Sequence, residues 1–207
     1  MNKYLEKVPL IAIIRGVKPE EAVAVTQALY DGGIRCVEVP LNSPNPYESI
    51  KLISEAFGDK MLVGAGTVLT IDQVRKVKDA GGEIGVSPNV NSDVISETKN
   101  LDMLSFPGIM TISEAFTALE SGADVLKLFP ADSVGKSFIK AAKAVLPSGT
   151  KVYAVGGVDE SNIQEWQRAG AEGFGLGSSL YKPDYSLNKI KALSEALNHY
   201  YAEPNHA

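Results

Sequence analysis

The chain has 207 residues, of which 44% are hydrophobic and 22% charged, as expected for a globular protein with one sizeable core. Its formal net charge of −5, without any Lys/Arg cluster, argues against nucleic-acid binding. No apolar stretch reaches the roughly 18–20 residues that span a bilayer, and the N-terminus lacks a signal-peptide core. The single cysteine, Cys36, excludes an internal disulfide and fits a small core residue in a reducing compartment. We therefore expect a cytoplasmic protein that binds neither nucleic acid nor a membrane.

Short apolar runs alternate with longer amphipathic segments eight times along the chain. The runs predict β-strands, at Leu10–Arg15, Cys36–Asn42, Met61–Val68, Glu83–Pro88, Leu101–Pro107, Val125–Pro130, Lys151–Gly156 and Gly173–Gly177. The segments between them predict helices, because their starts carry proline or aspartate and many of their ends carry glycine. These helices are expected at Pro19–Tyr30, Pro46–Phe57, Ile71–Ala80, Ser92–Lys99, Ile112–Glu120, Lys136–Val145, Glu160–Ala169 and Ser186–Tyr201.

Eight strand–helix units with nearly continuous apolar strands predict the α/β class, with a parallel sheet covered by helices. Eight is the number that closes a (β/α)8 TIM barrel, and a unit of about 25 residues is short but sufficient. An open, doubly wound sheet is the alternative. We expect one domain over residues 1–207, with 202–207 as a frayed tail.

The predicted strands end in polar or glycine-rich residues, whereas their starts are plainer. In a barrel, active sites lie at the C-terminal ends of the strands, so this asymmetry predicts a site at that face. The strand ends in question are Arg15-Gly16, Asn42-Ser43, Gly64 to Thr67, Ser87 to Asn89, Gly156-Gly157 and Gly177 to Ser179.

One lysine stands in an unexpected place. Lys127 lies inside the apolar run Val125–Ala131, where desolvation favours a free amine that can form a Schiff base with a ketone. Side chains alternate along a strand, so Lys127 is expected on the opposite face from its two leucine neighbours, pointing into the barrel. The same argument points Glu38 and Arg15 inward. A purely structural ion-pair network is the alternative reading of these three residues.

The last two predicted strands are followed by glycine-rich turns. Barrels frequently bind phosphate there, because glycine lets backbone N–H groups approach an anion closely. Gly156, Gly157, Gly177 and Ser178 are therefore expected to form a phosphate cradle, although glycines can also serve only for tight turns.

Neither a metal nor a dinucleotide is expected as cofactor. The two histidines, His199 and His206, both lie near the C-terminus, away from the predicted site, so zinc ligands and a Ser-His-Asp arrangement are lacking. No G-x-G-x-x-G motif follows a strand.

Eight ordered motifs resemble the 2-keto-3-deoxy-6-phosphogluconate aldolase family, over nearly the whole chain. They are Ile-Ile-Arg-Gly (13–16), Val-Glu-Val-Pro-Leu-Asn-Ser-Pro (37–44), Val-Gly-Ala-Gly-Thr-Val (63–68), Ser-Pro-Asn (87–89), Phe-Pro-Gly (106–108), Leu-Lys-Leu-Phe-Pro-Ala (126–131), Val-Gly-Gly-Val (155–158) and Leu-Gly-Ser (176–178). The resemblance implies a TIM-barrel class I aldolase. It also implies a homotrimer that uses a covalent lysine imine and no metal.

The resemblance also assigns roles to residues. Lys127 matches the Schiff-base lysine, Glu38 the general acid/base, and Arg15 an arginine near the substrate carboxylate. Further matching positions are Thr67 and Pro88 at the pyruvyl end of the site, and Gly156, Gly157, Gly177 and Ser178 in the phosphate cradle.

Two positions differ from members that act on the gluconate substrate. Asn42 stands where those members usually have arginine, and Val155 stands where they tend to have threonine before the Gly-Gly pair. Both departures resemble the 2-dehydro-3-deoxy-6-phosphogalactonate branch, whose substrate has the other configuration at C4. A missing hydroxyl partner costs about 1–3 kcal/mol, so Val155 is a plausible stereochemical determinant and a substrate-binding residue.

The expected reaction is cleavage of 2-dehydro-3-deoxy-6-phospho-D-galactonate to pyruvate and D-glyceraldehyde 3-phosphate, in galactonate or galactose catabolism. Aldolases for the gluconate epimer or for 4-hydroxy-2-oxoglutarate are the alternatives within the family. Outside it stand a phosphosugar epimerase or isomerase, which needs no buried lysine, and a non-catalytic phosphosugar-binding barrel.

Overall fold

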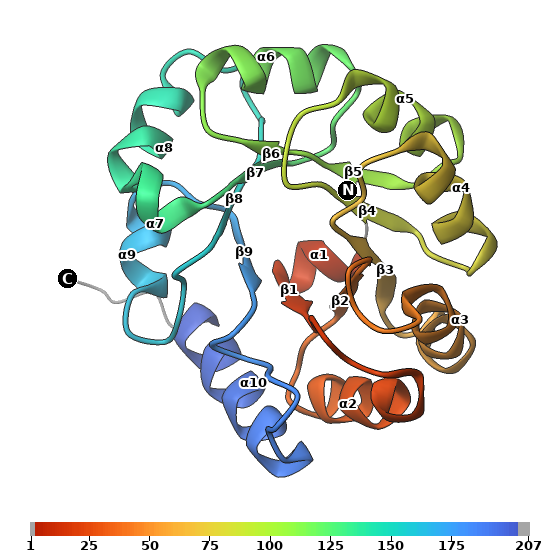
Figure 1. Ribbon diagram of the computed structural model, residues 1–207. Coiled ribbons are helices and arrows are strands. Elements are labelled where there is room, and N and C mark those ends of the chain that lie inside the picture. Colours follow the sequence, from red (N-terminus) through yellow and green to blue (C-terminus); the bar gives the residue numbers. More distant parts are fainter. Residues whose placement is uncertain (1–2, 203–207) are drawn as a thin grey trace.

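The computed structural model describes residues 3–202. Strands and helices alternate along the chain, and the helices surround the strands as an outer ring (Figure 1). Of the predicted frayed tail, Ala202 is the last residue of the C-terminal helix, while residues 203–207 lie outside the described part of the chain.

Nine parallel strands form one sheet in the order β5-β4-β3-β2-β1-β9-β8-β7-β6. Consecutive strands are neighbours, as expected when each strand is followed by a helix that returns the chain to the same end of the sheet. The strands are β1 (Leu10–Ile13), β2 (Cys36–Pro40), β3 (Leu62–Gly66), β4 (Ile84–Val86), β5 (Leu104–Phe106), β6 (Gly108–Ile109), β7 (Leu126–Leu128), β8 (Val152–Val155) and β9 (Gly173–Leu176).

The ninth strand, β6, was not expected: it lies just beyond the predicted end of the fifth strand at Pro107, whereas β5 lies within the predicted range. A proline has no N–H to donate to a sheet, so β5 and β6 are separate although they are consecutive. Their segment joins both edges of the sheet: the Phe106 carbonyl accepts from Ser87 N (3.0 Å) beside β4, and the Pro107 carbonyl accepts from Lys127 N (2.9 Å) on β7. The predicted TIM barrel is thereby confirmed, and the open sheet is excluded.

The eight predicted helices are present, with small differences at their ends, and two short helices, α1 and α7, were not expected. The helices are α1 (Lys3–Lys7), α2 (Pro19–Asp31), α3 (Pro46–Phe57), α4 (Ile71–Asp79), α5 (Ser92–Asn100), α6 (Ile112–Glu120), α7 (Ala131–Val134), α8 (Lys136–Lys143), α9 (Ile163–Arg168) and α10 (Leu187–Ala202).

The predicted start of α9 at Glu160 is wrong by three residues. The Asp159 carboxylate accepts hydrogen bonds from Ser161 N (2.9 Å) and Ser161 Oγ (2.6 Å). An aspartate that bonds the backbone two residues ahead forms a turn, and this turn replaces the first helical turn. Similarly, α8 ends at Lys143, two residues before its predicted end at Val145, and Ala144 after it still has helical backbone angles.

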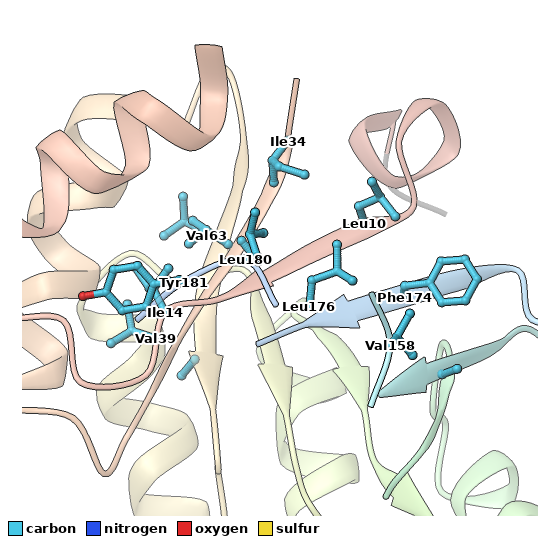
Figure 2. Packing of buried hydrophobic residues seen from close by; sticks show 14 of the residues in the cluster. Leu10, Ile14, Ile34, Val39, Val63, Val158, Phe174, Leu176, Leu180 and Tyr181 are labelled. Atoms are coloured by element: carbon cyan, nitrogen blue, oxygen red, sulfur yellow. The ribbon is translucent and has the colours of Figure 1, made fainter. Parts of the chain in front are cut away.

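Buried side chains form two layers, one between strands and helices and one inside the barrel. The outer layer is the larger, and Figure 2 shows its part around Ile14, Val39, Val63 and Leu176. The inner layer consists of Leu5, Ile11, Cys36, Leu62, Ile84, Val86, Phe106, Val125 and Tyr153. The barrel is therefore a packed core and not a pore.

Leu5 of α1 is fully buried and belongs to the inner layer, although it comes from outside the strands. The other members of that layer lie on the strands, apart from Val125 directly before β7, so α1 contributes to the packing of the barrel interior (Figure 1). Among the described residues, no helix combines the length and apolar character needed to cross a membrane.

Leu5→Ala should lower the free energy of unfolding by about 2–4 kcal/mol, because it leaves a cavity in the inner layer. Lys7→Ala removes an exposed side chain of the same helix and should change stability by less than about 0.5 kcal/mol. Urea unfolding followed by circular dichroism measures both values. Equal effects of the two substitutions would contradict the packing role of α1.

Candidate active site

Lys127 lies in the middle of β7 and points into the barrel. Its neighbours Leu126 and Leu128 belong to the outer core layer, as side-chain alternation predicts. Only 7% of Lys127 is exposed, and its strand neighbours in register are Gly108 and Tyr153. The amine is therefore held in a largely apolar interior.

Glu38 lies on β2 and is 2% exposed. A side-chain carbon on Gly66 of the adjacent strand β3 would come within 2.0 Å of Glu38 Oε2, so only glycine leaves room for this carboxyl group. Glu38 Oε2 is buried without a hydrogen-bond partner among the described residues. A buried oxygen in this condition favours the neutral, protonated carboxyl group over the carboxylate.

The two groups have displaced pKa values for the same physical reason. Burial raises the pKa of Glu38 to about 7, while the charges of Lys127 and Arg15 act more weakly in the opposite direction. Burial lowers the pKa of Lys127 to about 8; the Glu38 charge opposes this shift and the Arg15 charge adds to it. A lysine with this pKa is roughly one-tenth free amine at pH 7, far more than an exposed lysine. Desolvation therefore outweighs the neighbouring positive charges in setting the pKa of Glu38.

Arg15 follows the end of β1 and is exposed at the mouth of the barrel. Its Nη1 donates a hydrogen bond to Oδ1 of Asn42, which follows β2. The next residues of the two loops are also joined, because Gly16 N donates to Ser43 Oγ at 3.0 Å. A guanidinium with its remaining donors at this mouth can bind a carboxylate through two parallel hydrogen bonds.

The glycine-rich turns after β8 and β9 line a cavity of about 320 Å³. Gly156 and Gly157 both have left-handed backbone conformations, with φ of 102° and 70°. A side-chain carbon at Gly157 would approach Asp132 Cβ to 2.6 Å, whereas one at Gly177 would meet open space. The lining residues are Ile13, Arg15, Phe129, Val155, Gly156, Gly157, Val158, Asp159, Gly175, Gly177, Ser178 and Ser179.

A second, much smaller void of about 10 Å³ lies beside Lys127 and Glu38. Three residues line both spaces, namely Ile13, Val155 and Gly175, so the glycine-rich cavity adjoins the buried amine. A molecule with a ketone at one end and an anionic group several bonds away fits this arrangement chemically.

Thr67 and Pro88 are placed at the same face but line neither space. Thr67 follows β3 directly and has a left-handed backbone with φ of 58°, and Pro88 follows Ser87 after β4. The Ser87 hydroxyl donates to the Val68 carbonyl at 2.7 Å and ties these two loops together. Their predicted role at the pyruvyl end therefore stays a prediction.

Phe129 is a site residue that the sequence analysis did not single out. The Lys127 Nζ atom lies 4.4 Å from the centre of the Phe129 ring, and Phe129 also lines the glycine-rich cavity. An aromatic face at this distance stabilises a positive charge on nitrogen. The signal was present, because side-chain alternation puts Phe129 on the same strand face as Lys127.

A metal site is not formed by the described residues, since they contain no group of three or more His, Cys, Asp or Glu side chains that could hold an ion. His199 lies on α10, and His206 lies outside the described part of the chain.

Lys127→Met should raise the melting temperature near pH 7.5, because it removes a buried ammonium group that costs stability below its folded pKa of about 8. The gain should shrink as the pH rises from 8 towards 10.5, where the wild-type amine is neutral in both states. Each kcal/mol corresponds to roughly 2–4 °C. Lys140→Met, an exposed lysine, is the control, and a wild-type melting temperature above that of Lys127→Met at pH 7.5 would contradict the burial cost.

The chain matches the family model described as KDPG and KHG aldolase over residues 1–193. It is 47% identical over 201 residues to 2-dehydro-3-deoxy-6-phosphogalactonate aldolase of Escherichia coli K12, covering 97% of this chain and 98% of the relative. It is also 47% identical over 183 residues to a probable aldolase of the same name from Rhizobium meliloti, covering 88% and 86% of the two chains.

Solved structures agree with these relatives. A structure described as native KDPGal superposes with a TM-score of 0.93 at 47% identity, covering 95% of each chain. KDPG aldolase from Legionella pneumophila, with pyruvate captured as a covalent carbinolamine, superposes with a TM-score of 0.84 at 29% identity, covering 92% of this chain and 94% of that one. The buried lysine, the glycine-rich cavity and these similarities lead to one conclusion: the chain belongs to the KDPG and KHG aldolase family.

Proposed function

We propose that this protein is a class I aldolase that cleaves 2-dehydro-3-deoxy-6-phospho-D-galactonate to pyruvate and D-glyceraldehyde 3-phosphate. The observation that carries the proposal is the buried amine of Lys127, next to Glu38 and adjoining a glycine-rich cavity. Two relatives with the corresponding name and 47% identity support the galactonate substrate.

The reaction begins when the neutral amine of Lys127 attacks the C2 ketone. Loss of water gives an iminium ion, which withdraws electrons from the C3–C4 bond. Removal of the proton from the C4 hydroxyl then breaks this bond and releases the aldehyde. The enamine that remains takes a proton at C3, and water hydrolyses the pyruvyl imine to free the lysine. The Phe129 ring, 4.4 Å from Nζ, faces the nitrogen on which the positive charge develops.

Glu38 is the group proposed to move these protons. Efficient acid–base groups have pKa values close to the working pH, and burial raises the pKa of Glu38 to about 7. Its unpartnered Oε2 can donate or accept a proton without first breaking a hydrogen bond to the protein. Glu38 takes the proton from the C4 hydroxyl oxygen and gives a proton to C3, either directly or through one water molecule.

The two ends of the substrate are bound by different groups. The phosphate occupies the cavity lined by Gly156, Gly157, Gly177 and Ser178, since glycine-rich turns let a backbone approach an anion closely. The carboxylate next to the ketone binds Arg15 at the barrel mouth. Because the phosphate is remote from the breaking bond, its binding energy positions the reacting carbons.

Val155 is the proposed determinant of C4 configuration. Val155 is almost fully buried, and it lines both the glycine-rich cavity and the void beside Lys127. In the proposed position of the substrate, C4 lies between these two spaces. A valine methyl in this position offers no hydrogen bond to a C4 hydroxyl, whereas threonine would offer one.

The covalent step is tested by incubating the protein with pyruvate and borohydride and then mapping the adduct by peptide mass spectrometry. We expect a reduced pyruvyl adduct on Lys127 that forms faster as the pH rises from 6 to 8, because the amine loses its proton over this range. Lys127→Ala should give no adduct, and Glu38→Gln should form the adduct but turn over at least about 100-fold more slowly. Folded wild-type protein without an adduct would move the non-catalytic phosphosugar-binding function ahead.

Val155→Thr should shift the ratio of kcat/KM for the galactonate and gluconate epimers towards gluconate by about 10-fold, as the new hydroxyl gains one hydrogen bond. Coupled assay of pyruvate release from each epimer gives the ratio. Val152→Thr is the control, since Val152 belongs to the outer core layer and not to the site. An unshifted ratio would remove Val155 as the determinant.

The protein's wider setting follows the same family. We propose a homotrimer, supported by large apolar side chains exposed near the barrel mouth, including Leu69, Ile71 and Met110, which a partner subunit would cover. A cytoplasmic location is proposed because the described cysteine, Cys36, is buried as a free thiol. No metal or organic cofactor is part of the proposed mechanism, because the imine of Lys127 provides the electron sink.

A further inference from the structure

The Arg15 guanidinium is positioned from two sides at the mouth of the barrel. Its backbone is fixed by the hydrogen bond from Ile14 N to the Glu38 carbonyl (3.1 Å) and by the bond from Gly16 N to Ser43 Oγ (3.0 Å). Neither bond reaches the end of the side chain, which is exposed and has several rotatable bonds. The end is held by Asn42, whose Oδ1 accepts from Arg15 Nη1.

The place of Arg15 matters because it lies next to both spaces. Arg15 lines the glycine-rich cavity, and it follows two residues after Ile13, which lines both that cavity and the void beside Lys127 and Glu38. In the imine, Lys127 Nζ bonds C2 of the substrate, and the carboxylate carbon C1 is attached to this C2. The carboxylate oxygens therefore lie only two bonds from C2. An arginine that swings away into solvent would leave this carboxylate without a cation.

We propose that Asn42 is a positioning residue that holds the Arg15 guanidinium over the barrel mouth for the carboxylate of the 2-keto acid. This inference rests on the proposed function and adds a residue to it. Asn42 does not touch the reacting atoms; it uses its carbonyl oxygen on Arg15 Nη1, so that the other guanidinium donors remain for the substrate. The proposal commits Arg15 to the carboxylate end of the substrate and not to the phosphate.

The test is a double-mutant cycle of Asn42→Ala and Arg15→Ala, assayed in the condensation direction, where pyruvate carries only the carboxylate and glyceraldehyde 3-phosphate carries only the phosphate. Asn42→Ala should raise the KM for pyruvate about 3- to 10-fold, with the KM for the aldehyde and kcat changed less than about twofold. In the Arg15→Ala background, Asn42→Ala should have no further effect, because its partner is gone.

Two control variants separate this role from general loop structure. Ser43→Ala removes the neighbouring tie to the Gly16 backbone but leaves the bond between Asn42 and Arg15 in place, so it should change the KM for pyruvate less than Asn42→Ala does. Gln27→Ala removes an exposed side-chain hydrogen bond to Asp31 on α2, far from the barrel mouth, and should change neither KM.

The outcomes distinguish a failure of the role of Asn42 from a failure of the proposed aldolase function. Equal effects of Asn42→Ala in both backgrounds, or a rise in the KM for the aldehyde instead of pyruvate, would overturn the role of Asn42. The borohydride adduct of wild-type protein is measured alongside. If that adduct forms and the cycle is additive, only this inference fails. If the adduct is absent, the proposed function itself fails, and the inference fails with it.

Discussion

The removal of the Lys127 amine from water is the interaction on which the rest of this structure depends. A lysine that is 7% exposed loses most of the hydration of its ammonium form, and this loss lowers its pKa to about 8. The inner layer of the barrel creates this condition, because Phe106 and Tyr153 fill the space around the amine with rings that offer it no anionic partner. A core that would ordinarily serve only stability thus also holds an amine that is partly unprotonated near neutral pH.

The same desolvation acts on Glu38 in the opposite direction and brings the two groups to nearly the same pKa. An exposed pair would exist as carboxylate and ammonium at neutral pH, which suits a salt bridge but not proton transfer. Burial instead brings the pKa of Glu38 to about 7 and that of Lys127 to about 8, so that both groups change protonation state near neutral pH. The purely structural ion-pair network considered from the sequence does not account for the unpartnered Oε2 of Glu38.

Small residues make this arrangement possible as much as the charged ones do. Gly66 leaves space for the Glu38 carboxyl group, and Gly173 leaves space for the Tyr153 ring, which a side-chain carbon there would approach to 2.3 Å. Gly157 turns the chain against Asp132 with a left-handed backbone. These glycines therefore divide between packing the barrel interior and lining the glycine-rich cavity.

The sequence by itself determined the order of elements and the inward direction of the key side chains. The alternation around Lys127 and Glu38 fixed their faces, because a strand places successive side chains on opposite sides. It also located the glycine-rich turns after β8 and β9, since chain order in a barrel sets which loops lie together. Tertiary structure decided what depends on contacts between distant segments: the additional strand β6 after Pro107, the burial of Leu5 from α1 inside the barrel, and the bond between Asn42 and Arg15. It also decided the Glu38 pKa, because the balance between desolvation and neighbouring charge depends on the whole surrounding volume and not on spacing along the chain.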